Sequence, residues 1–245
     1  RDPEMSRGLG DVYKRQELEK NMLKLSHIKK SYKKNEVLTD ISFTFEEGQI
    51  YPILGGPGAG RTTLFECICG DISVDDGSIV TIDKCKYFYA AKQSVLPVYI
   101  TGYEFISMLC DMERDDPEPE DIFDRIGFSV AKRDELIADY TFEEKKLLQL
   151  ACILVIRPYV VLFDEPLDYC SEEYINKFIE VINTIKEGRI ILISTGLLEI
   201  SKRISEDTLV LNNGEFNHID KKTMEIPEIR KAVLDILGET DNEII

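Results

Sequence analysis

The spacing of apolar and polar residues predicts strands and helices in alternation along most of the chain. Residues 23–31 form one predicted strand, and residues 41–45 place apolar side chains on one face of a second. The apolar run 50–54 predicts a short buried strand. Because proline removes a hydrogen-bond donor from a sheet, we expect Pro52 near the start of this strand or at a bulge.

The middle of the chain changes to a helical pattern. A helix is predicted over residues 62–69, ending at Gly70, and a strand over residues 77–82. Residues 100–154 are mainly helical in character. They contain a dense acidic run at 111–124, which we interpret as a solvated helix face or loop.

Two apolar segments, residues 159–163 and 190–193, predict strands that are buried on both faces. The predicted helix between them ends at Gly188. Its apolar face carries Ile175, Phe178, Ile179, Ile182 and Ile185. A hairpin is predicted over residues 209–216 and a final helix over 226–237.

Strands that alternate with helices are typical of a parallel sheet covered on both faces. We therefore expect an α/β fold with a mainly parallel sheet, an antiparallel β portion near the N-terminus and a helical insertion at about residues 98–150. One domain over residues 17–245 accounts for the pattern, which contains no internal repeat.

Composition and charge exclude two classes of function. Hydrophobic residues make up 43% of the chain and charged residues 31%, as in ordinary globular proteins. No apolar run reaches the roughly 18 residues of a membrane-spanning helix, so we expect no direct membrane insertion. The formal net charge of −16 argues against a nucleic-acid partner, which requires clustered Lys and Arg. It does not exclude a phosphate ligand held by backbone N–H groups.

Six cysteines, at positions 67, 69, 85, 110, 152 and 170, lie mostly among apolar residues. The spacing of Cys67 and Cys69 does not match a zinc motif. Buried free thiols are typical of a reducing compartment, so we expect a cytoplasmic protein.

Residues 1–16 are polar and show no periodicity. They resemble a translated cloning or sequencing adapter, and a native disordered leader is the alternative. In both cases the segment is left out of the fold prediction.

A glycine-rich loop follows the predicted strand at 50–54 and precedes the helix at 62–69. Its frame is that of a phosphate-binding P-loop, G-x-x-x-x-G-K-S/T, with Arg61 in place of lysine. Glycines let successive N–H groups point inward at phosphates, and the helix N-terminus adds partial positive charge. We expect Thr62 to offer its hydroxyl to Mg²⁺ and Arg61 to reach the β- and γ-phosphates of ATP. The predicted ATP-binding residues of the loop are Gly55, Gly56, Pro57, Gly58, Ala59, Gly60, Arg61, Thr62 and Thr63.

Asp164 and Glu165 directly follow the apolar strand at 159–163. In P-loop NTPases an aspartate at the end of a neighbouring strand holds Mg²⁺, which predicts Asp164 as a metal ligand. Glu165 is placed to polarise an attacking water as the catalytic general base. Each motif also has a purely structural alternative. The loop could be a glycine-rich turn that joins strand to helix, and the two acids could be solvated residues at a strand end. The two motifs together favour a P-loop NTPase.

With both motifs in place, the chain resembles the ATP-binding-cassette (ABC) family over residues 22–216. The resemblance implies an ATP-binding subunit with ATP and Mg²⁺ as cofactors. Tyr32 falls at the family's adenine-stacking position, and a tyrosine packed at a strand end is the alternative. Gln93 resembles the glutamine that reaches Mg²⁺ and links the core to the helical insertion.

Three positions depart from the family pattern. The signature loop, L-S-G-G-Q, appears as residues 140–144, where Phe142 and Glu143 bring bulk and negative charge to a loop that closes over ATP of the opposite subunit. Gly196 replaces the switch histidine, and Ser171 stands where the family has an aspartate. Removing one preorganised donor costs about 10²–10³ in rate. We therefore expect ATP binding to survive and fast hydrolysis by a homodimer to be lost.

Two functions fit these residues. The first is an ATP-hydrolysing subunit that works with a membrane permease at the inner face of the cell membrane, while a second nucleotide-binding subunit supplies an intact signature loop. The second is a degenerate module that binds ATP and stabilises a heterodimer without turnover. In both we favour a heterodimer over a homodimer. A GTPase or small-molecule kinase is disfavoured, because the sequence has no N-K-x-D motif and no arginine-rich lid.

Overall fold

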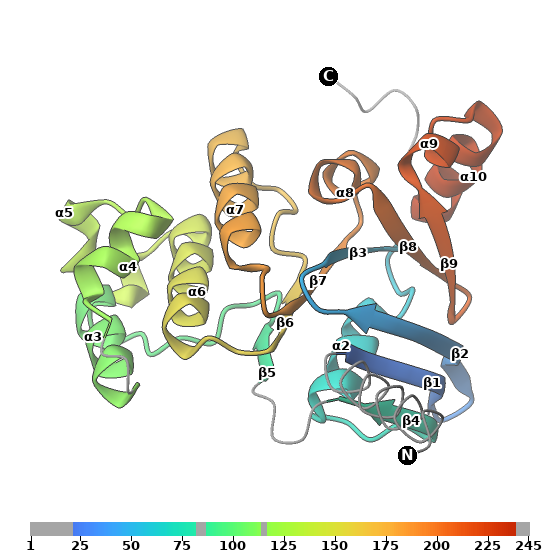
Figure 1. The fold of residues 1–245 in the computed structure, drawn as a ribbon, viewed down its shortest axis with the longest axis horizontal. Coiled ribbons are helices and arrows are strands. Elements are labelled where there is room, and N and C mark those ends of the chain that lie inside the picture. The colour runs from blue at the N-terminus through green and yellow to red at the C-terminus, as the bar shows by residue number, and fades with distance from the viewer. Residues whose placement is uncertain (1–21, 82–86, 114–116, 239–245) are drawn as a thin grey trace, which may run out of the picture.

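The computed structural model describes residues 22–81, 87–113 and 117–238. The predicted leader, residues 1–16, and Cys85 lie outside the described residues. Within these ranges nine strands form a single sheet in the order β4-β1-β2-β9-β8-β3-β7-β6-β5 (Figure 1). The strands are β1 (Met22–Tyr32), β2 (Asn35–Glu46), β3 (Ile50–Leu54), β4 (Asp76–Val80), β5 (Tyr87–Ala90), β6 (Val160–Asp164), β7 (Ile190–Thr195), β8 (Asp207–Asn212) and β9 (Glu215–Asp220).

Helices of the described chain lie on both sides of this sheet (Figure 1). They are α2 (Arg61–Cys69), α3 (Gly102–Met112), α4 (Pro119–Ile126), α5 (Val130–Arg133), the 3₁₀ turn η1 (Ile137–Asp139), α6 (Phe142–Ile156), α7 (Glu172–Ile185), α8 (Leu198–Ile204), α9 (Lys221–Met224) and α10 (Pro227–Leu237). None of the helices in the described ranges is long and apolar enough to span a bilayer.

The centre of the sheet is parallel, and β6 and β7 are buried on both faces. β3 pairs with β7 and β8, and β6 pairs with β5 and β7, all in parallel. In β6, Val161 and Phe163 belong to the core that contains α6 and α7, whereas Val160 and Leu162 belong to the core that contains α2. Burial on both faces explains why Val160–Phe163 in β6 and Ile190–Ile193 in β7 are wholly apolar.

The N-terminal part of the sheet is antiparallel. β1 pairs with β2 on one side and β4 on the other, and β8 and β9 form the predicted hairpin. The predicted fold class, a mainly parallel α/β sheet with an antiparallel N-terminal portion, is confirmed. The helices α3 to α6 group together beyond the β5 edge (Figure 1). They occupy the stretch predicted as an insertion, residues 98–150, and α6 continues past it.

Pro52 lies in the middle of β3, opposite Ile193, so its placement at the strand start was wrong. The ladder between β3 and β8 covers only Ile53 and Leu54, which leaves the proline outside that pairing. Residues 117–124 of the acidic run include the start of α4. The exposed carboxylates in its first turn interact favourably with the positive end of the helix dipole.

Candidate functional site

The glycine-rich loop turns between the end of β3 and the start of α2. Gly58 and Gly60 have φ angles of 78° and 99°, in the left-handed region that favours glycine. The Ala59 N–H donates to the carbonyl of Gly56 at 3.1 Å, and the Leu64 N–H donates to Gly60 at 2.8 Å. Because the first amides of a helix have no intrahelical acceptor, those at the start of α2 are available to an anion.

Gly60→Ala is expected to destabilise the fold by about 1–3 kcal/mol, because the substitution adds backbone strain and a steric clash. A Cβ at this position would lie 2.8 Å from Val37 Cγ1 and 3.2 Å from Leu38 Cδ2. Gly58→Ala is the matched control, since its Cβ would meet nothing within 4 Å and only the strain remains. Urea unfolding of both variants measures the difference. Equal losses would show that the contact with Val37 does not restrict the loop.

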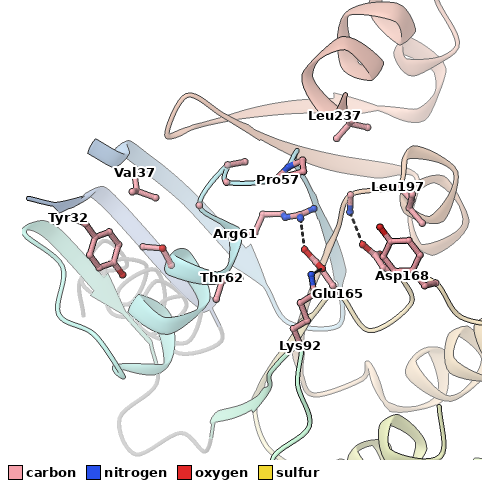
Figure 2. Close-up of a pocket in the computed structure, with 16 residues that line it drawn as sticks. Tyr32, Val37, Pro57, Arg61, Thr62, Lys92, Glu165, Asp168, Leu197 and Leu237 are labelled. Atoms are coloured by element: carbon pink, nitrogen blue, oxygen red, sulfur yellow. Dashed lines mark hydrogen bonds and ion pairs between the residues drawn. The ribbon is translucent and has the colours of Figure 1, made fainter. Parts of the chain in front are cut away.

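A cavity of about 720 Å³ opens over the loop (Figure 2), within the range of about 300–1,000 Å³ typical of small-molecule sites. Its lining consists of Tyr32, Val37, Pro57, Gly58, Ala59, Gly60, Arg61, Thr62, Thr63, Lys92, Glu165, Asp168, Tyr169, Gly196, Leu197 and Leu237. Most residues predicted for the site are therefore brought together. Of the predicted residues, Gly55, Gly56, Gln93 and Asp164 lie outside this lining.

Asp164 ends β6 in direct contact with the start of α2. Its carboxylate is 1% exposed, and Oδ2 accepts a hydrogen bond from Thr62 Oγ1 at 2.8 Å. Ser194 Oγ donates to Oδ1 at 2.6 Å, and the Tyr89 hydroxyl donates to Oδ2 at 3.3 Å. Mg²⁺ in nucleotide sites binds one or two protein oxygens together with phosphate oxygens. The Thr62 hydroxyl and the Asp164 carboxylate have the chemistry that such an ion requires.

Tyr89 is a neighbour of this pair that the sequence analysis missed. Burial and the charge of Asp164 raise the pKa of Tyr89 above its usual value, so the phenol keeps its proton. It is therefore a stable donor to the carboxylate. A tyrosine within an aromatic strand has no distinguishing pattern, so only the pairing of β5 with β6 reveals this contact.

Glu165 directly follows β6 and has a left-handed backbone, with φ of 47°. Its N–H donates to Ser194 Oγ at 2.9 Å. The carboxylate lies between two cations, because Oε1 accepts from Arg61 Nη2 at 2.6 Å and Oε2 contacts Lys92 Nζ (Figure 2). The hydrogen bond to Glu165 raises the pKa of Lys92 above its usual value. Glu165, the predicted general base, is therefore paired with cationic side chains of the chain itself.

Lys92 and Asp168 are two further charged residues of the cavity that the sequence analysis did not identify. Asp168 is buried, and it accepts hydrogen bonds from Thr195 Oγ1 at 2.9 Å and from the Gly196 N–H at 3.4 Å. Burial raises the pKa of Asp168 above its usual value, and the bond from Thr195 opposes that shift. Both residues follow strand ends, and a single charged residue in a loop carries no spacing signal.

Tyr32 and Gln93 differ in their relation to the cavity. Tyr32 lies at the end of β1, lines the cavity and is 46% exposed. The stacking role of its ring stays a prediction. Gln93 is exposed, and among the described residues of this segment Lys92 is the one that reaches the cavity. The Mg²⁺ role of Gln93 also stays a prediction.

The segment that replaces the signature loop begins α6. Thr141 caps this helix and accepts from the Glu144 N–H at 3.2 Å. The Glu143 carboxylate accepts from the Ser171 N–H at 2.5 Å and from Ser171 Oγ at 3.0 Å. Because Ser171 is the N-cap of α7, the charge of Glu143 lies at a helix N-terminus. Two departures from the family pattern, at 143 and 171, are thus in contact with each other.

Known proteins resemble this chain over most of its length. The phosphonates import ATP-binding protein of Fusobacterium nucleatum subsp. nucleatum is 25% identical over 241 residues, covering 86% of this chain and 97% of that protein. The ribose import ATP-binding protein of Bacillus licheniformis is 25% identical over 239 residues, covering 88% of this chain and 48% of that protein. The chain therefore spans about half the length of the ribose protein.

Solved structures share the fold. An ATP-binding subunit of an ABC transporter superposes with a TM-score of 0.73 at 22% identity, covering 89% of this chain and 98% of that one. A dimeric post-hydrolysis ATP-binding cassette bound to ADP and Pi gives a TM-score of 0.71 at 16% identity, with coverage of 81% and 98%. At these identities the likeness is evidence for the fold alone.

The sequence profile described as ABC transporter matches residues 38–168, which is more than half of the 245 residues. This range contains the glycine-rich loop, the helices α3 to α6 and the acidic end of β6. The chain therefore belongs to the ABC transporter family.

Proposed function

We propose that the chain is the ATP-binding subunit of a transporter and that it couples the binding of Mg-ATP to a membrane permease. The hydrogen bond from Thr62 Oγ1 to Asp164 Oδ2, at 2.8 Å, carries this proposal. It joins the phosphate loop and the acidic strand end beside one cavity. The curated relatives are named as import ATP-binding proteins, which supports a role in transport.

The residues divide the work by chemistry. Backbone N–H groups of the loop and the start of α2 hold the phosphates, and Tyr32 stacks on the base. The Thr62 hydroxyl and the Asp164 carboxylate would hold Mg²⁺, which would neutralise phosphate charge. Glu165 accepts a proton from the attacking water. Phosphate donors, a stacking ring, oxygen ligands and a general base are the groups that ATP binding and hydrolysis require.

The segment that replaces the signature loop, residues 140–144, indicates which partner the chain requires. Phe142 is 47% exposed at the start of α6, and Glu143 is engaged with Ser171. A second nucleotide-binding subunit with an intact signature loop would complete the site, so a heterodimer is favoured. The subunit acts in the cytoplasm, at the inner face of the membrane, through a permease. Mass measurement with ATP and a candidate partner distinguishes a heterodimer from a homodimer.

Tyr32→Ala is expected to weaken ATP binding by about 5- to 150-fold, because one base-stacking contact is lost. Displacement of a fluorescent ATP analogue in the presence of Mg²⁺ measures this change. Tyr99→Ala is the control, because Tyr99 is 90% exposed and lies outside the cavity lining. The same assay compares ATP with GTP. Selectivity for guanine, or no binding of either nucleotide, would contradict the proposed function.

A further inference from the structure

Arg61 reaches from the start of α2 to the glutamate that follows β6. Its side chain is only 8% exposed, and Nη2 lies 2.6 Å from Glu165 Oε1. Figure 2 shows the guanidinium directed at Glu165, with Lys92 approaching the same carboxylate. Lys92 is 61% exposed and therefore screened by water, so Arg61 is the stronger constraint on Glu165.

Gly196 borders the space that the guanidinium occupies. A Cβ on Gly196 would lie 3.5 Å from Arg61 Nη1 and 3.7 Å from Asp168 Oδ2. The backbone of Gly196 is not in the left-handed region, so its conformation does not require glycine. An alanine has room at these distances, but a β-branched side chain adds two atoms beyond a Cβ that already touches Arg61 and the buried Asp168. The guanidinium and Asp168 thus favour a small residue at this position.

One donor of the guanidinium remains free. Arg61 Nη1 is buried and has no hydrogen-bond partner among the described residues. The charge of Arg61 also lowers the pKa of the neighbouring Asp168, against the larger effect of burial. A planar guanidinium holds two partners in fixed directions, whereas a lysine ammonium is a single point charge. Arg61 therefore has one nitrogen bonded to Glu165 and a second, buried nitrogen without a partner among the described residues.

We propose that Arg61 and Gly196 are a matched pair, in which the guanidinium positions Glu165 and a small residue at 196 leaves room for it. The inference rests on the proposed function, because the position of Glu165 matters to turnover only if this carboxylate acts on water beside ATP. Arg61 is then a positioning residue in addition to its place in the phosphate loop.

A double-mutant cycle tests the pairing without nucleotide. Gly196→Val is expected to destabilise the full chain in urea, and Gly196→Ala to leave its stability nearly unchanged. In an Arg61→Lys background, Gly196→Val should cost less, with a coupling of at least about fivefold in the unfolding equilibrium constant. Arg125→Lys, on the exposed face of α4, is the control background and should leave the cost unchanged. Additive effects of Arg61→Lys and Gly196→Val would overturn the pairing.

A second cycle tests the positioning of Glu165 through turnover of ATP by the chain assembled with its partners. Arg61→Lys should lower kcat at least tenfold in the wild type and have no further effect on kcat in a Glu165→Gln background. Its effect on KM should be the same in both backgrounds. A kcat loss that persists in Glu165→Gln, or a wild type with no turnover, would overturn the positioning role. Loss of ATP binding by the wild type would instead reject the proposed function, and the unfolding cycle would still decide the pairing.

Discussion

Glu165→Gln is expected to slow phosphate release by about 100- to 10,000-fold, the usual contribution of a positioned general base. Glutamine keeps the length and shape of the side chain, and its amide oxygen still accepts from Arg61 Nη2. The amide cannot accept a proton from water. ATP affinity is therefore expected to change by less than about tenfold. The measurement is phosphate release at saturating Mg-ATP by the chain assembled with its partners.

A matched substitution separates this effect from a general loss of charge. Glu228, exposed on α10, offers the same Glu→Gln change away from the cavity and should leave the rate unchanged. Equal rates for Glu165→Gln and the wild type would remove Glu165 from the mechanism. The chain would then act as the alternative binding module, in which ATP is held without turnover.

Asp164→Asn is expected to weaken the magnesium-dependent part of ATP binding by at least ~100-fold. Unit charges 4 Å apart interact by about 4 kcal/mol at an effective dielectric constant of 20, and an ion with two charges interacts more strongly. Even when desolvation offsets most of this energy, loss of the Asp164 charge removes a large share of the ion's binding. Titration of a fluorescent ATP analogue at increasing Mg²⁺ measures the change.

Asp164→Asn should reduce the stability of the fold less than it reduces the affinity for Mg-ATP. The donors from Thr62, Ser194 and Tyr89 surround the carboxylate, and the two aliphatic hydroxyls can rotate to accept from an amide. Asp121→Asn, on the exposed face of α4, is the control for the loss of one negative charge. If Asp164→Asn bound Mg-ATP as tightly as the wild type, Asp164 would not be a metal ligand.

The central strands were predictable from the sequence because both of their faces are buried. Residues 160–163 and 190–193 lack polar side chains for this reason, and they lie in β6 and β7. The glycine-rich loop was predictable because its φ angles favour glycine. Pro52 was misplaced because its neighbours in the sheet, β7 and β8, lie more than a hundred residues away in sequence.

The site was only partly predictable, because several of its contacts join distant segments. Lys92 and Asp168 are single charged residues in loops, and each reaches the cavity through the parallel pairing of strands. Glu143 illustrates the same limit. Its charge was expected to face a nucleotide, and the structure shows it bound to Ser171 at the start of α7. Arg61 was likewise expected to contact the phosphates of ATP. In the structure its Nη2 donates a hydrogen bond to Glu165 Oε1.

Isothermal titration calorimetry of ATP into the wild-type chain, with and without saturating Mg²⁺, tests the central claim most directly. The claim is that the loop amides, Thr62 and Asp164 enclose a magnesium-bound triphosphate. One ATP should bind per chain, with an affinity that falls when EDTA removes the metal. No heat of binding at saturating Mg²⁺ would contradict the claim.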